Sequence, residues 1–219
     1  MRRVALGFAV VCALSAIKPA VACDANSVLF QDNFATVNPG WVPDPWSKNS
    51  VSIGGGALKI APQLPPSASP GYNYSVFVPY RGDVYERADA CADLTLSGGS
   101  GMPDGHAGMI FDDEDYGGFY YFWVSPKNGN AGVSRWSEPA EKWVEGMAAT
   151  KVQGLGAKTA LRVTVNGTHA DVYVNGEQIG QLTVRATKIG GFFGLAASRT
   201  YGDASTWTFT NFKITDVPH

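Results

Sequence analysis

The 219-residue chain is poor in charge: Asp, Glu, Lys and Arg make up 16% of its residues, and its formal net charge is −2. Domains that bind nucleic acid are strongly basic, so the charge balance argues against a nucleic-acid partner. Only three histidines are present, and they are scattered without the spacing of metal ligands. Disorder is excluded as well, because 45% of the residues are hydrophobic and 12% are aromatic.

Helical periodicity is lacking too. No stretch keeps a 3.6-residue apolar stripe for three turns, and 26 glycines and 13 prolines favour turns over long helices. Apolar and polar residues alternate instead, most clearly in Leu161–Val165, His169–Val174 and Gln178–Val184. The dipeptides Asn166-Gly167 and Asn175-Gly176 between them suit tight hairpin turns, so we predict three antiparallel strands in a meander.

Ten further segments have the pattern of short strands, and clusters of Gly and Pro separate them. These segments are Val51–Ile53, Ala57–Ile60, Tyr74–Pro79, Ala90–Ser97, Ala107–Asp112, Gly118–Val124, Val133–Trp136, Lys142–Glu145, Gly191–Ala197 and Ser205–Thr215. A dozen short strands at this spacing predict an all-β, two-sheet antiparallel sandwich. We expect residues 23–219 to form one such domain, and to be a monomer.

A long hydrophobic run is found only near the N-terminus, where Val4–Ile17 follows the basic residues Arg2 and Arg3. The run is too short for an ordinary membrane span, and the small-x-small pattern of a cleavage site follows at residues 20–22. We therefore expect residues 1–22 to be a signal peptide. The domain would then be exported, to the periplasm or the extracellular space, with no transmembrane segment.

Three cysteines are present, and Cys12 lies within the expected signal peptide. Cys23 and Cys91 would enter an oxidising compartment as a pair, so we predict one disulfide between them. The alternative is that Cys23 is the lipid-modified first residue of a lipoprotein. Ala20 stands where such a signal prefers leucine, and Cys91 would then have no partner.

The segment Gly118–Val124 is bulky and apolar on both of its faces. Its odd-numbered residues from Phe119 to Trp123 project to one side of a strand, and its even-numbered residues from Tyr120 to Val124 project to the other. One side must supply the core. The other side is either covered as well or lines a groove for a ligand.

Three groups of motifs, in chain order, resemble the concanavalin A-like lectin/glucanase jelly roll, particularly its exported bacterial branch related to laminin G-like and DUF1080 (3-keto-disaccharide hydrolase) domains. They are Leu29–Phe34 with Gly40-Trp41; Ala107–Asp113 with Tyr116–Phe122; and Val174–Gly176 with Gly194–Ala197 and Thr208–Ile214. The resemblance implies two curved, packed sheets whose first and last strands pair. It also implies that sugars bind on the concave face, although a fold alone does not establish a function.

Aromatic residues are the main candidates for sugar contacts, because the C–H faces of sugars stack on rings while planar polar groups pair with the hydroxyls. We assign Trp41 and Trp207 to the core. Our candidate ligand-binding rings are Tyr121, Trp123, Trp136, Trp143 and the loop residue Trp46.

Polar candidates lie close to these rings along the chain. If the strands that follow the central hairpin are neighbours, Arg135 would share one sheet face with Tyr121 and Trp123, within cross-strand reach. Asp112 or Asp115 could pair with Arg135 across the hairpin. The acidic run Asp112–Asp115 is open to three interpretations: a solvated turn, a calcium loop or the polar rim of a sugar groove. We expect no other cofactor.

Catalysis has less support than binding. A glycosidase needs two carboxylates flanking the scissile bond, and the E-x-D-x-x-E run that the glucanases of this fold carry is missing. Our first hypothesis is therefore an exported domain that binds a carbohydrate or glycoconjugate without cleaving it. The alternatives are a DUF1080-like glycoside hydrolase that uses Asp112, Asp113 or Glu138, and a structural envelope domain.

Overall fold

The computed structural model describes residue 23 and residues 27–71, 73–98, 105–113, 118–137, 140–147, 156–185 and 190–217, with backbone alone for residues 112–113, 136–137 and 140–147. The strands in this part of the chain are β1 (Val28–Asp32), β2 (Val51–Gly54), β3 (Ala57–Ile60), β4 (Asn73–Tyr85), β5 (Arg87–Ser97), β6 (Ala107–Asp113), β7 (Phe119–Ser125), β8 (Asn130–Ser137), β9 (Ala140–Met147), β10 (Lys158–Asn166), β11 (His169–Val174), β12 (Glu177–Thr183), β13 (Gly191–Thr200) and β14 (Thr206–Thr215). One short 3-10 helix, η1 (Pro45–Ser50), accompanies them.

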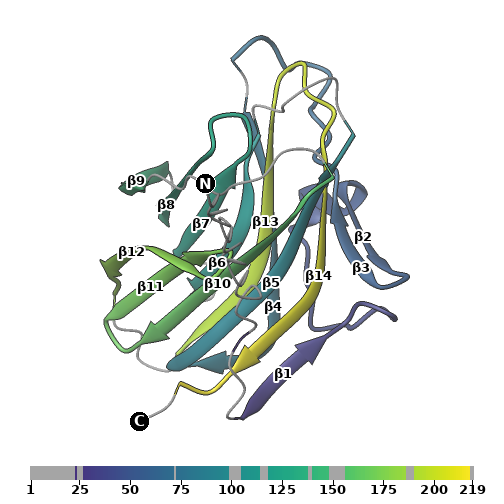
Figure 1. Ribbon diagram of the computed structural model, residues 1–219. Coiled ribbons are helices and arrows are strands. Elements are labelled where there is room, and N and C mark those ends of the chain that lie inside the picture. Colours follow the sequence, from purple (N-terminus) through teal and green to yellow (C-terminus); the bar gives the residue numbers. More distant parts are fainter. Residues whose placement is uncertain are drawn as a thin grey trace, which may run out of the picture.

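The described strands form two antiparallel sheets, which confirms the predicted sandwich (Figure 1). The eight-stranded sheet has the order β12-β11-β10-β5-β14-β3-β2, with β1 paired to β14 beside this path. The six-stranded sheet has the order β4-β13-β6-β7-β8-β9. Phe30 on β1 lies opposite Ile214 on β14, so the first and last strands pair, as the family resemblance implies.

The predicted meander is confirmed as β10, β11 and β12. Both Asn-Gly dipeptides lie in its turns, where Gly167 has φ 62° and Asn175 has φ 51°. Positive φ suits glycine and asparagine far better than other residues, which explains why these dipeptides mark the turns. On β10, Leu161 and Val163 face the core with at most 1% of their surface exposed.

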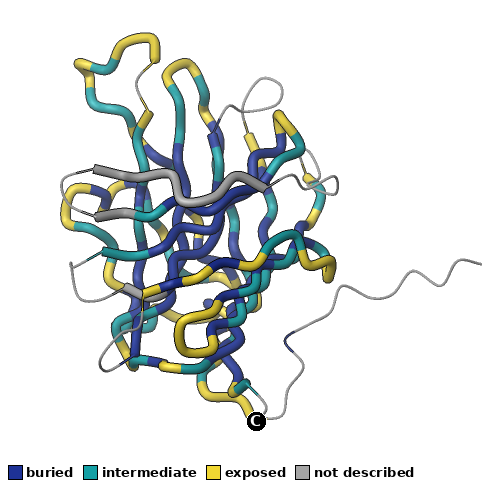
Figure 2. Tube along the Cα trace, turned by 90° about the vertical axis from the view of Figure 1, so that its left-hand side faces the viewer, coloured by how far each residue is buried: buried dark blue, intermediate teal, exposed yellow. Residues whose placement is uncertain are grey.

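The main core fills the space between the two sheets, and buried residues run along the middles of the strands while exposed ones gather in the loops (Figure 2). Trp207 and Phe209 on β14 and Phe122 on β7 are fully buried there. Trp41 is 4% exposed, and its Nε1 donates to Oδ2 of Asp32 over 2.9 Å. The assignment of Trp41 and Trp207 to the core is therefore confirmed.

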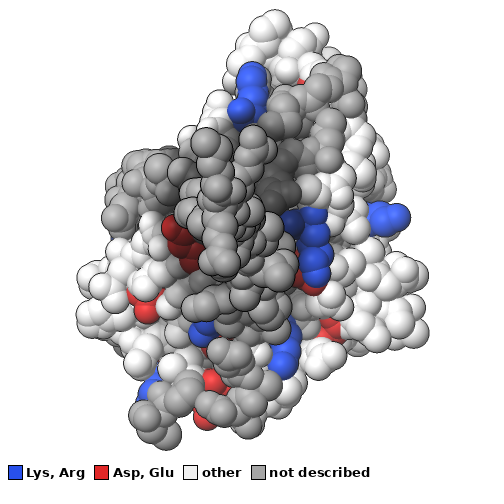
Figure 3. All heavy atoms as spheres, in the orientation of Figure 1, with Lys and Arg blue, Asp and Glu red and all other residues white. Residues whose placement is uncertain are grey.

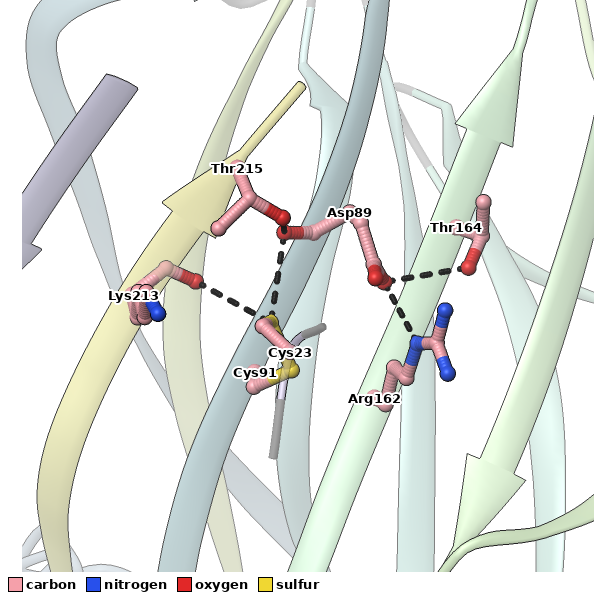
Figure 4. A network of polar contacts seen from close by, with 7 residues as sticks. All are labelled: Cys23, Asp89, Cys91, Arg162, Thr164, Lys213 and Thr215. Atoms are coloured by element: carbon pink, nitrogen blue, oxygen red, sulfur yellow. Dashed lines mark hydrogen bonds and ion pairs between the residues drawn. A yellow bond between two sulfur atoms is a disulfide. The ribbon is translucent and has the colours of Figure 1, made fainter. Parts of the chain in front are cut away.

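The predicted disulfide between Cys23 and Cys91 is present, with Cα atoms 5.8 Å apart (Figure 4). It ties the N-terminal segment to β5, close to the buried residue Asp89. The Asp89 carboxylate accepts hydrogen bonds from Nε of Arg162 (2.7 Å) and from Oγ1 of Thr164 (3.0 Å), both on β10. The Sγ atom of Cys23 that a lipoprotein would need for its lipid is thus engaged in a covalent bond.

Charged side chains on the face drawn in Figure 3 are scattered, and both signs occur, so the described residues form no large patch of one sign there. In the part of the chain that the structure describes, no helix is long and apolar enough to cross a membrane.

Loss of the disulfide should cost substantial stability. Its two cysteines are 68 residues apart, and closing a loop of that length restricts the unfolded chain enough to stabilise the fold by about 4 kcal/mol. We expect the double variant Cys23→Ser/Cys91→Ser to lose about that much free energy of unfolding in urea. Dithiothreitol should reproduce the loss in the wild type and leave the variant unchanged; equal stability of both proteins without reductant would contradict the prediction.

Candidate functional site

The side of the six-stranded sheet that faces away from the eight-stranded sheet carries a second cluster of buried apolar residues. It contains Ile110, Tyr121, Trp123 and Ala196, and the half-buried rings of Phe77 and Phe119 pack against it. We call these six residues the aromatic face. The neighbouring residues on the same strands point into the main core, so β6, β7 and β13 are apolar on both sides.

Small residues on the central strands make room for these rings. One row across the sheet, from β4 to β8, reads Phe77, Ala196, Gly108, Trp123 and Gly132. Trp123 therefore has a glycine opposite it on each neighbouring strand. A Cβ atom at Gly108 would lie 1.8 Å from the carbonyl oxygen of Phe122, so no larger residue fits that position without a shift of the backbone.

Rings from distant strands meet above this floor of small residues. The strands β4 and β7 are separated by β13 and β6, a distance of roughly 14 Å at the usual strand spacing. Nevertheless, the ring centroids of Phe77 and Phe119 are 4.8 Å apart, and those of Phe77 and Tyr121 are 5.9 Å apart. The side chains lean toward one another and form a small core of their own on the outside of the sheet.

A polar group lies at the Trp123 end of the aromatic face. The half-buried His106, just before β6, lies against Trp123 with ring centroids 5.0 Å apart and against Tyr121 at 5.7 Å. Its Nδ1 is hydrogen-bonded to Oγ of the fully buried Ser198 on β13. Nearby, Nε1 of Trp123 donates to Oγ of Ser134 over 3.0 Å, so the indole is held by a hydrogen bond as well as by packing.

Burial lowers the pKa of His106 from its ordinary value of 6.5 to about 4, because the charged imidazolium is desolvated there. His106 is therefore a neutral imidazole throughout the ordinary physiological pH range. A neutral imidazole offers one N–H donor and one acceptor nitrogen, and Ser198 engages only one of its two nitrogens.

The outer face of the eight-stranded sheet is different in character. Its side chains include the ion pairs Arg162–Asp89 (2.7 Å) and Lys158–Asp93 (3.0 Å). Its half-buried ring, Tyr173, lies under the guanidinium of Arg162 at 4.8 Å. This face has the alternation of a solvated sheet, apolar inside and polar outside. The aromatic face of the six-stranded sheet departs from that rule and is the candidate functional site.

Tyr121 and Trp123, both predicted from the sequence, lie in this site, but with only 2% and 7% of their surface exposed. The strands β7 and β8 are neighbours, as expected. The expected placement of Arg135 with Tyr121 and Trp123 is wrong. Arg135 lies opposite Tyr120, and its guanidinium is 6.0 Å from that ring, because the register pairs Tyr121 with Ser134. Arg135 is therefore on the other side of the sheet.

The remaining predicted site residues are spread over several elements. Trp46 lies on η1 with 87% of its surface exposed, and its backbone N–H donates to the Asp44 carboxylate over 3.2 Å. The preceding residues run alongside β4, at the edge of the six-stranded sheet. In register, Trp136 lies opposite Phe119 and Trp143 opposite Ser134. The side chains of Trp136, Trp143 and Asp112, and all of Asp115, lie outside the described residues.

Three residues that contribute rings to the site were not predicted from the sequence: Phe77, Phe119 and His106. For Phe119 the signal is present, because it alternates with Tyr121 and Trp123. Phe77 has only a weak signal, since β4 is apolar at several consecutive positions. For His106 the sequence has none, because its contact with Ser198 joins residues 92 positions apart.

Within the described residues, one group of three possible metal ligands occurs: Cys23, Cys91 and Asp89. Both sulfur atoms form the disulfide, so neither is available as a thiolate ligand. The side chains of Asp112–Asp115, for which a calcium loop was one of three interpretations, lie outside the described residues. The same holds for Asp113 and Glu138, the carboxylates of the hydrolase alternative.

Solved structures with a similar fold include carbohydrate-binding proteins and glucanases. The carbohydrate-binding module CBM66 of Bacillus subtilis is 14% identical, with a TM-score of 0.59 over 81% of this chain and 96% of the module. The laminarinase catalytic domain of Thermotoga maritima is 12% identical, with a TM-score of 0.63 over 88% and 99%. The carbohydrate recognition domain of Emp47p is 11% identical, with a TM-score of 0.56 over 85% and 94%.

These similarities identify the fold as a concanavalin A-like jelly roll, as the sequence motifs indicated. No family model matches the sequence, so the finer resemblance to DUF1080 domains has no such support. No curated protein matches the sequence either.

The lowered pKa of His106 predicts acid sensitivity. The unfolded chain takes up this proton near pH 6.5, whereas the native protein takes it up only near pH 4, so stability falls as the pH drops through that window. The loss amounts to about 3 kcal/mol. The variant His106→Asn should not show this acid-induced loss of stability, and His169→Asn should still show it. Urea unfolding at pH 7 and pH 4 measures how much free energy of unfolding each protein loses on acidification. An equal loss in His106→Asn and the wild type would contradict the assignment.

Proposed function

We propose that this protein binds a carbohydrate on the aromatic face of its six-stranded sheet. The observation that carries the proposal is the apolar character of this sheet on both sides, while the outer face of the other sheet is polar. The rings of Phe77 and Phe119 keep part of their surface exposed on this outer side, although the main core of the sandwich lies between the sheets. Such a surface is typical of a site that a ligand covers.

The chemistry of the face suits a sugar. The C–H face of a pyranose or furanose packs against an aromatic ring, and Phe77 and Phe119 are the half-buried rings that such a ligand would meet. Tyr121 and Trp123 lie deeper and would support these rings. Polar groups for the hydroxyls are available at the edges, from His106 and from Trp46 with its capping residue Asp44.

The fold supports the same function. Two of the similar structures are named as a carbohydrate-binding module and a carbohydrate recognition domain, and others are glucanases. The Cys23–Cys91 disulfide supports export, because disulfides persist in oxidising compartments. We propose an exported binding protein rather than a hydrolase, since the sequence lacks the E-x-D-x-x-E run that the glucanases of this fold carry.

Removal of a ring from the aromatic face should weaken binding without changing the fold. We expect Phe119→Ala to bind its glycan about tenfold more weakly, because we place this ring among the few contact residues that carry most of the affinity and cost more than 1 kcal/mol when truncated. The matched control is Tyr173→Ala, which removes a half-buried ring from the outer face of the other sheet. Calorimetric titration with a panel of oligosaccharides measures both affinities.

Three results would contradict this proposal. They are binding to no glycan in the panel, equal affinity of Phe119→Ala and the wild type, and an equal loss in Tyr173→Ala. Release of reducing sugar by the wild type during the titration would replace the binding role with the hydrolase alternative.

A further inference from the structure

His106 is the polar side chain that lies directly against the rings of the aromatic face, in contact with both Trp123 and Tyr121. Its ring makes one hydrogen bond, through Nδ1 to Ser198. Among the described residues no hydrogen bond to Nε2 is formed, and Nε2 is not a buried atom without a partner. His106 keeps part of its surface exposed. Nε2 is therefore the ring nitrogen that a ligand can reach.

The hydrogen bonds around Ser198 hold the inner side of this ring. The Ser198 hydroxyl accepts from the backbone N–H of His106 over 3.0 Å, donates to the carbonyl oxygen of His106 over 3.2 Å and is hydrogen-bonded to Nδ1. Nδ1 is therefore engaged within the protein, and the outward nitrogen is Nε2. A sugar hydroxyl both donates and accepts, so it can hydrogen-bond to Nε2 in either tautomer of the neutral ring.

The described neighbours of the imidazole carry no charge. The imidazole lies against the edge or face of two aromatic rings, and its third described neighbour is an uncharged hydroxyl. A carboxylate or sulfate placed here would lose its hydration for a single neutral hydrogen-bonding group, which does not offset the cost of desolvation. A sugar hydroxyl loses far less hydration and forms the same hydrogen bond.

We propose that His106 is a specificity-determining residue of the binding site, whose Nε2 hydrogen-bonds to a hydroxyl of a neutral glycan at the Trp123 end of the aromatic face. This inference rests on the proposed carbohydrate-binding function and deepens it by naming the ligand as neutral. The Ser198 contact positions the ring, and the backbone of β6 and β13 positions Ser198. Such a group selects sugars that present a hydroxyl at that point of the face.

Two substitutions separate the contact from its support. In His106→Asn the side-chain amide reaches the position of Nδ1, so the hydrogen bond to Ser198 can form while the outward hydrogen-bonding group is lost. In His106→Gln the amide reaches the position of Nε2, so an outward hydrogen-bonding group is restored. The matched control is His169→Asn, a histidine exposed on β11 of the other sheet.

The experiment titrates each variant with neutral hexasaccharides of β-1,3-linked glucose, β-1,4-linked glucose and β-1,4-linked mannose, and with hexagalacturonate as the acidic probe. Circular dichroism checks that each variant is folded. We expect the wild type and His169→Asn to bind a neutral probe with equal affinity, His106→Asn to bind it about tenfold more weakly, and His106→Gln to recover most of the loss. A merely structural role would not give recovery with Gln.

The outcomes distinguish the two proposals. If a neutral probe binds and Phe119→Ala weakens it while His106→Asn does not, the role of His106 is wrong and the binding face stands. Preference for hexagalacturonate overturns the assignment of a neutral ligand. Failure of every probe to bind overturns both proposals. If His106→Asn does not fold, an affinity of His106→Gln below one tenth of the wild type contradicts the role of Nε2.

Discussion

Trp123 lies between Gly108 on β6 and Gly132 on β8, and the outer surface of the six-stranded sheet is built around that arrangement. A large indole can lie across neighbouring strands only where those strands carry no side chain in its way. The main-chain crowding at Gly108 fixes glycine there. Because the residues between these strands are small, the side chain of Phe77 on β4 reaches Phe119 on β7. A second apolar cluster therefore forms outside the sandwich.

The two sheets differ in their outer faces. The outer face of the eight-stranded sheet is polar, and the Cys23–Cys91 disulfide there ties the N-terminal segment to β5 beside the Asp89 network (Figure 4). The six-stranded sheet shares the core between the sheets but turns a hydrophobic face outward. A neutral histidine at one end of that face adds a hydrogen-bonding group without adding charge. This combination suits recognition of a ligand that is itself half apolar and half hydroxylated.

The sequence was sufficient for the fold and for part of the site. Two-residue alternation and the Asn-Gly turns predict β10 to β12 because both are local properties of the chain. Tyr121 and Trp123 follow from the alternation within β7. Arg135 was placed on the wrong side because a face depends on cross-strand register, and no local pattern sets which residue of β8 lies opposite Tyr121. The His106–Ser198 contact is non-local in the same sense.

We propose that ligand binding takes place on the aromatic face. Nuclear magnetic resonance mapping of backbone and aromatic-ring chemical shifts, during titration with a glycan that binds, tests this location directly. We expect the largest changes at Phe77, Phe119 and Trp123 and on the strands that carry them. Changes confined to β5, β10 and β14, around Arg162 and Tyr173, would place the ligand on the other sheet and contradict the proposal.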